Sequence, residues 1–162
     1  MILQTYTLIH VLIGLIGILS GLVVLSGLLT GKPCSGWTLV FLIATVLTSV
    51  TGFFFPSHGV LPSHIAGVIS LIVLAAAIYA RYVRRLNGIW RKIYVISAML
   101  ALYLNVFVAI VQAFLKIPVL KAMAPTQTEP PFKITQLVVL VLFVGLAIVA
   151  SIRFRDKPAS LA

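Results

Sequence analysis

The chain has 162 residues, of which 62% are hydrophobic and 9% are charged, whereas soluble globular domains carry roughly a quarter charged residues. This composition excludes a water-soluble domain and indicates an integral membrane protein. The formal net charge of +10 does not indicate nucleic-acid binding, because the lysines and arginines lie between the apolar runs and not among aromatic residues on a folded surface.

Five apolar runs follow one another along the chain, and each is close to the length of about 20 residues that a helix needs to cross a bilayer. They cover residues 5–29, 37–55, 63–82, 93–115 and 134–152. Gly and Pro in residues 30–33 end the first run, and Pro56 ends the second. We therefore predict an all-α integral membrane bundle of five transmembrane helices, with residues 1–162 forming one domain.

The connections predict the orientation of the bundle. A hydrophilic turn, residues 84–92, joins the third run to the fourth, and a proline-rich surface loop, residues 116–133, leads to the fifth. Cytoplasmic loops are enriched in lysine and arginine, so we predict an N-terminus outside and a C-terminus in the cytoplasm, with membrane phospholipid as the partner of the basic turn. Nine basic residues then lie inside (Lys32, Arg81, Arg84, Arg85, Arg91, Lys92, Arg153, Arg155, Lys157) and three outside (Lys116, Lys121, Lys133).

A weak internal repeat pairs the first two helices with the next two. His10 precedes Trp37 by 27 positions, and His64 precedes Trp90 by 26. Both tryptophans then fall at the cytoplasmic interface, where indole rings are enriched. The pattern predicts two tandem helical hairpins plus a fifth helix, with a pseudo-two-fold axis along the membrane normal.

Several kinds of site are disfavoured by the residues that the chain lacks. Glu129 and Asp156 are its only acidic residues and both fall outside the runs, so no carboxylate can relay protons inside the membrane. No hydrolase or nucleotide-binding motif is present. Cys34 is the single cysteine, which excludes an internal disulfide. His58, in a short loop, is expected to be solvated.

The two remaining histidines, His10 and His64, fall at equal depth near the outer face, on helices that can face each other across a bundle. Two such imidazoles meet the requirement for axial ligation of one b-type haem. Gly14, Gly17 and Gly21 follow His10 on one helix face and would leave room for a porphyrin. The same spacing of small residues is also typical of close helix–helix packing.

Polar residues on neighbouring helices could support such a site. Asn105 and Gln112 share one face of the fourth helix, and either amide, or the hydroxyl of Thr48 or Thr51, could accept the second N–H of a ligating imidazole. The alternative is that these groups only hold the helices together through hydrogen bonds.

Two resemblances follow from these residues. The positions of His10 and His64, the tryptophan-containing turns and the segment 103–112 resemble small uncharacterised bacterial inner-membrane proteins. The layout is also similar to four-helix cytochrome b bundles, which implies haem b held by membrane histidines. Histidines are missing from the cytoplasmic helix ends, so at most one bis-histidine haem is expected.

Three functions remain open from the sequence. The first is a single-haem protein of the bacterial inner membrane, with His10 and His64 as ligands and Asn105 and Gln112 tuning the site, that exchanges electrons with quinol or a periplasmic acceptor. The second is a non-enzymatic accessory or assembly subunit whose glycine-rich first helix docks on a partner membrane protein. The third is a passive carrier of a small neutral solute.

Overall fold

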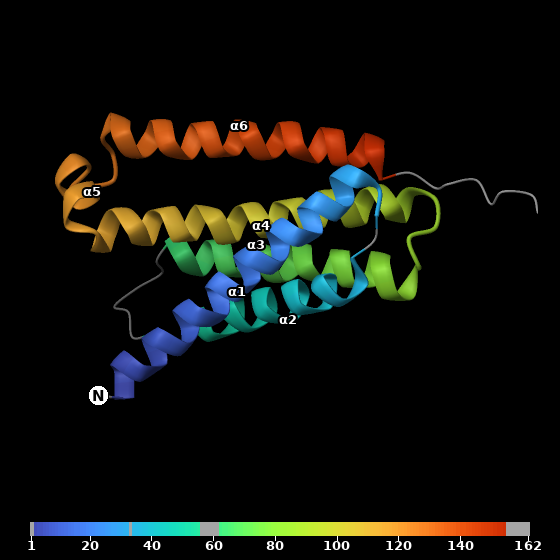
Figure 1. Cartoon of the computed structure of the whole chain (residues 1–162). Helices are drawn as coiled ribbons and strands as arrows, with labels where there is room; N and C mark the ends of the chain where they lie inside the picture. Colours follow the sequence, from blue (N-terminus) through green and yellow to red (C-terminus); the bar gives the residue numbers. More distant parts are fainter. Residues whose placement is uncertain (1, 33, 56–61, 155–162) are drawn as a thin grey trace, which may run out of the picture.

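The computed structural model describes residues 2–32, 34–55 and 62–154, and every regular element in these ranges is helical (Figure 1). The elements are α1 (Ile2–Thr30), α2 (Ser35–Gly52), α3 (Pro62–Ile78), the π-helical turn η1 (Tyr79–Val83), α4 (Ile89–Lys116), α5 (Pro118–Met123) and α6 (Pro130–Arg153). Among the described residues, five helices are long and apolar enough to cross a membrane, which confirms the predicted number of spans. The loop residue His58 lies outside the described ranges.

Helices α1 to α4 form a bundle in which each helix packs against the next along the chain, and α1 also packs against α4 (Figure 1). Helix α6 lies on the outside of this bundle, against α4 and α1, and the short α5 packs against α4. Helix α4 therefore contacts more of the other helices than any other element. Its buried residues include Tyr94, Val95, Ala101 and Leu102.

The two ends of the bundle differ in charge. The end that we call the histidine end holds the starts of α1, α3 and α6 together with α5 (Figure 1), and its ionisable residues include His10, His64, Lys116, Lys121 and Lys133. The opposite end, which we call the arginine end, carries Lys32, Arg81, Arg84, Arg85, Arg91, Lys92 and Arg153. Between them lies an apolar length that matches five membrane crossings.

Local backbone chemistry sets the helix boundaries at the arginine end. Helix α1 stops where Gly31 adopts a φ of +68°, and the Lys32 N–H then bonds the Gly27 carbonyl at 2.9 Å, a glycine-terminated cap. Helix α3 closes with η1, where the Arg84 N–H bonds the Tyr79 carbonyl at 3.0 Å, five residues back.

The largest boundary differences from the sequence prediction arise where a helix starts at a proline or directly after a glycine. Helix α4 begins at Ile89, directly after Gly88 with its φ of +57°, and not at residue 93. Helix α6 begins at Pro130, and α5 begins at Pro118 within the predicted loop 116–133. Proline fits the first helical turn, where its missing N–H costs no hydrogen bond.

Candidate functional site

His10 lies at the histidine end of α1 and reaches across to the last turn of α2. Its Nδ1 is 2.8 Å from the Thr51 hydroxyl oxygen, and that hydroxyl donates its own proton to the Leu47 carbonyl at 2.6 Å. A hydroxyl has one proton, so with that proton donated to the Leu47 carbonyl we infer that His10 is the donor through Nδ1–H. The Nε2 of a neutral His10 ring then carries a lone pair, which is the form of imidazole that binds a metal ion.

Aromatic rings from the chain just beyond α2 cover both imidazoles. The Phe55 ring meets His10 edge-on, with centroids 5.0 Å apart, and the Phe53 ring stacks on His64 with centroids 5.8 Å apart and planes 12° apart. Phe53 also approaches α3, since a Cβ placed on Gly67 would lie 3.1 Å from the end of its ring. The two histidines are thus held by the same short segment of chain.

The two imidazoles lie on different sides of the C-terminal end of α2. Thr51 faces α1, where it meets His10, whereas Ser49 faces α3, where its hydroxyl donates to Ser70 at 3.2 Å. Residues two apart on a helix point about 200° apart. Phe53 lies on the Ser49 side, together with His64. The structure therefore brings His10 together with Thr51, and His64 together with Phe53, but each imidazole has its own aromatic cover.

The glycine face of α1 is filled by protein. A Cβ placed on Gly17 would lie 3.3 Å from both the Asn105 amide nitrogen and the Thr45 hydroxyl. One placed on Gly21 would lie 2.5 Å from Leu102 and 3.0 Å from the Phe41 ring. Gly17 and Gly21 therefore let α1 approach α2 and α4 closely, as in other small-residue helix contacts.

Only the outermost glycine of this face remains next to the histidines. A Cβ on Gly14 would lie 3.5 Å from the Thr48 methyl group, which is an ordinary contact distance. The Thr48 hydroxyl is buried without a hydrogen-bond partner in the described part of the chain. Buried hydroxyls usually bond protein or water, so this position near His10 has an unmet polar group.

The two amide residues suggested by the sequence, Asn105 and Gln112, lie in different surroundings. Asn105 donates its amide N–H to the Thr45 hydroxyl at 3.0 Å, which joins α4 to α2 in the middle of the membrane. Gln112 lies two turns nearer the histidine end on α4 and is half-buried. Asn105 is thus part of the helix packing, and Gln112 is the amide of this pair that lies toward the histidines.

A second polar cluster, which the sequence did not reveal, lies toward the arginine end. The Arg81 side chain donates to the Ser35 hydroxyl at 3.2 Å, and its guanidinium lies 5.3 Å from the centroid of the Tyr94 ring. The Tyr94 hydroxyl in turn is 3.5 Å from that of Thr38. In the sequence, this cluster could have been suspected only from Ser35 and Thr38. These two hydroxyl residues lie three positions apart at the start of α2 and therefore share one helix face.

The loop after α5 is fastened to α4. The Gln127 amide donates to the Val111 carbonyl at 2.9 Å, and the Glu129 carboxylate accepts bonds from the backbone N–H groups of Thr126 and Thr128 at 3.2 and 3.0 Å. Desolvation acts to raise the pKa of Glu129, but a hydrogen bond from the Thr126 hydroxyl at 2.8 Å and the two backbone bonds stabilise the charged form, so the pKa lies below its ordinary value.

Comparisons with family models, with curated proteins and with solved structures found no match. The function is therefore inferred from the contacts of this chain alone. The described residues contain no cluster of three or more histidine, cysteine, aspartate or glutamate side chains that could hold a metal ion.

Proposed function

We propose that this protein is a five-span inner-membrane protein that holds one b-type haem at its histidine end, with His10 and His64 as axial ligands. The observation that carries the proposal is the Thr51 hydroxyl, which accepts the Nδ1–H of His10 and so keeps the Nε2 of the neutral ring deprotonated. A bound haem would supply a one-electron redox centre for exchange with quinol or a periplasmic acceptor.

The contacts limit where a macrocycle can lie. Gly17 and Gly21 are closed off by α2 and α4 side chains, so these two glycines do not take the role that the sequence suggested. The rings of Phe55 and Phe53 lie against His10 and His64, so haem binding requires both rings to turn away. Thr51 orients His10. Of the two amides suggested by the sequence, Gln112 keeps the proposed role of tuning the site.

The test is an absorption spectrum of the purified protein, oxidised and dithionite-reduced, from a haem-replete host. We expect a Soret band with sharp reduced α and β bands, lost in His10→Ala and in His64→Ala and retained in His58→Ala, which serves as the matched control. A featureless visible spectrum from folded wild-type protein would overturn the haem proposal.

A second candidate is a non-enzymatic accessory subunit of a membrane complex. The small number of buried residues on α6 favours it, because most of this helix is free to contact a partner. Only Gln136, Phe143 and Ala150 of α6 are buried, and nothing lies within 4 Å of a Cβ placed on Gly145. Side chains of α2 and α4 lie against Gly17 and Gly21 of α1, so we propose α6, and not the glycines of α1, as the docking surface. A colourless wild-type protein that co-purifies with a stoichiometric partner, and loses this partner in the variant Gly145→Leu, would support the subunit function. A colourless protein that purifies without a partner would favour the passive carrier.

A further inference from the structure

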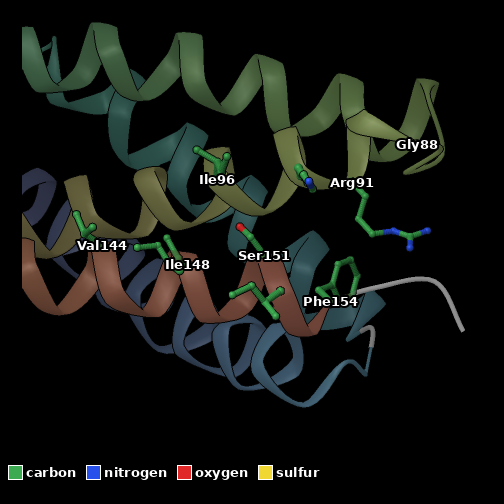
Figure 2. A pocket seen from close by; sticks show the side chains of 10 residues that line it. Gly88, Arg91, Ile96, Val144, Ile148, Ser151 and Phe154 are labelled. Carbon is green, nitrogen blue, oxygen red and sulfur yellow. The ribbon is translucent and has the colours of Figure 1, made fainter.

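A groove opens at the arginine end between the first turns of α4 and the last turns of α6 (Figure 2). Its volume is about 650 Å³, which is within the range of small-molecule sites, about 300–1,000 Å³. Arg91 lies at the outer end of the groove, and Ile96, Val144 and Ile148 lie farther along it (Figure 2). The groove is therefore charged at its mouth and apolar along its length.

The charged mouth is built from two adjacent cations. Arg91 and Lys92 occupy the first turn of α4, and both line the groove. The Arg91 guanidinium lies 6.0 Å from the centroid of the Phe154 ring, which holds it beside the end of α6. Lys92 is exposed. Two basic side chains at this level would face the headgroup layer of a bilayer that covers the five spans.

The apolar part follows α6 into the membrane. From Ser151 to Val144 the groove follows about two turns of the helix, or about 10 Å at a rise of 1.5 Å per residue. Ala147 and Ile148 line the stretch between them. This length and chemistry match the first part of a lipid acyl chain.

We propose that this groove is a binding site for an anionic phospholipid, with the phosphate at Arg91 and Lys92 and one acyl chain along Val144 and Ile148. The site is separate from the histidine end, so it stands or falls independently of the haem. Charge complementarity selects the ligand: basic residues at the headgroup level favour an anionic lipid over a neutral quinone, and a free phosphate ion would leave the apolar stretch uncovered. An acidic peptide would also leave this stretch uncovered.

The experiment uses the full chain, purified in detergent and stripped of lipid. Binding is measured by native mass spectrometry and by the rise in melting temperature with three probes: dioleoyl phosphatidylglycerol, dioleoyl phosphatidylcholine and inorganic phosphate. We expect phosphatidylglycerol to form a one-to-one complex at least about tenfold tighter than either of the other two probes, since two basic residues contribute to its binding.

Three variants locate the site. The double variant Arg91→Gln/Lys92→Gln should lose about tenfold in phosphatidylglycerol affinity, whereas Lys116→Gln/Lys121→Gln, with the same loss of charge at the histidine end, should not change it. The variant Val144→Trp fills the apolar stretch without altering charge and should also weaken binding. Val144 is exposed, so this variant should fold.

The opposite results would overturn the proposal. Equal binding of phosphatidylcholine would remove the role of the phosphate charge, and equal binding of inorganic phosphate would make the ligand a free anion. An equal loss in the control pair Lys116→Gln/Lys121→Gln would mean that overall charge, and not this groove, attracts the lipid. Unchanged binding in Val144→Trp would place the acyl chain elsewhere.

Discussion

His10 donates its Nδ1–H to the Thr51 hydroxyl, 2.8 Å away, across the contact between α1 and α2. The hydroxyl of Tyr6, one turn earlier on α1, donates to the backbone carbonyl of the same threonine at 2.6 Å. The first turns of α1 are thus fixed to the end of α2 by two hydrogen bonds that converge on one residue. This residue sets both the position and the proton location of the imidazole.

The variant Thr51→Val should destabilise the protein and remove the hydrogen bond that fixes His10 in its Nδ1–H tautomer. It removes the hydroxyl while keeping the shape of the side chain, and interhelical hydrogen bonds of this kind in membranes contribute about 0.6 kcal/mol on average and up to about 1.7 kcal/mol. Nitrogen NMR of labelled histidine should show an Nδ1–H tautomer in the wild type. Thr7→Val is the control, since Thr7 bonds only the Leu3 carbonyl within α1. A wild-type Nε2–H tautomer would contradict the assignment.

Adding one methyl group to Gly21 should be costly, whereas adding it to Gly145 should not. A Cβ on Gly21 meets Leu102 at 2.5 Å and the Phe41 ring at 3.0 Å, and both side chains are almost fully buried. Overpacking of this kind costs typically about 1–3 kcal/mol. Gly145→Ala enters open space and gains helix propensity of about 1 kcal/mol. Thermal unfolding in detergent compares the two, and equal stability would contradict the packing of α1.

Asn105 and Thr45 should be energetically coupled. In a double-mutant cycle with Asn105→Ala and Thr45→Val, the 3.0 Å bond between them should give a coupling energy of about 0.6 kcal/mol or more. Each single variant also alters the surroundings of Gly17, and the cycle subtracts these separate effects from the coupling energy. Additive effects of the two substitutions would mean that the bond contributes nothing to stability.

Cys34 provides a direct measurement of orientation. It is the only cysteine in the chain, and its partly exposed thiol lies in the turn between α1 and α2 at the arginine end. The excess of basic residues there favours the cytoplasmic side. A membrane-impermeant maleimide should therefore label Cys34 in inverted vesicles and not in intact cells. Labelling in intact cells would place the N-terminus inside.

Acid should loosen the loop that follows α5. The pKa of Glu129 in the folded chain lies below its ordinary value of 4.5, so its stabilising contribution is complete above about pH 4.5 and is lost as the pH falls through the folded-state pKa. Hydrogen exchange of the Thr126 and Thr128 amides, corrected for intrinsic rates, should accelerate over that range. The variant Glu129→Gln should remove this pH dependence while leaving exchange in α4 unchanged.

The number of spans could be predicted from the sequence because each apolar run is nearly the length of a membrane crossing. The starts at Ile89 and Pro130 are not evident in the sequence, because the hydrophilic residues before 93 and the prolines before 134 are typical of a turn and a loop, whereas here they form the first turns of helices. The short α5 was missed for the same reason.

The candidate site was harder to predict because it depends on helix rotation. Sequence spacing shows that Gly17 and Gly21 share a face, but not that Thr45 and Phe41 of α2 and Asn105 and Leu102 of α4 fill it. Likewise, equal depth of His10 and His64 did not reveal that His10 meets Thr51 at the end of α2, whereas His64 meets Phe53 in the chain just beyond it. The contact between Arg81 and Tyr94 joins η1 to α4, and no local pattern predicts it.

The hydroxyl-bearing face of α2 has a consequence for how the chain enters the bilayer during synthesis. Thr38, Thr45 and Ser49 of this helix are buried, and α2 has the lowest mean hydropathy of the five spans, whereas α1 has the highest. Alone in lipid, α2 would present these hydroxyls to acyl chains, where they find no external hydrogen-bond partner. Helix α1 emerges first from the ribosome and covers part of this helix, so biogenesis favours insertion of α1 and α2 together as a hairpin.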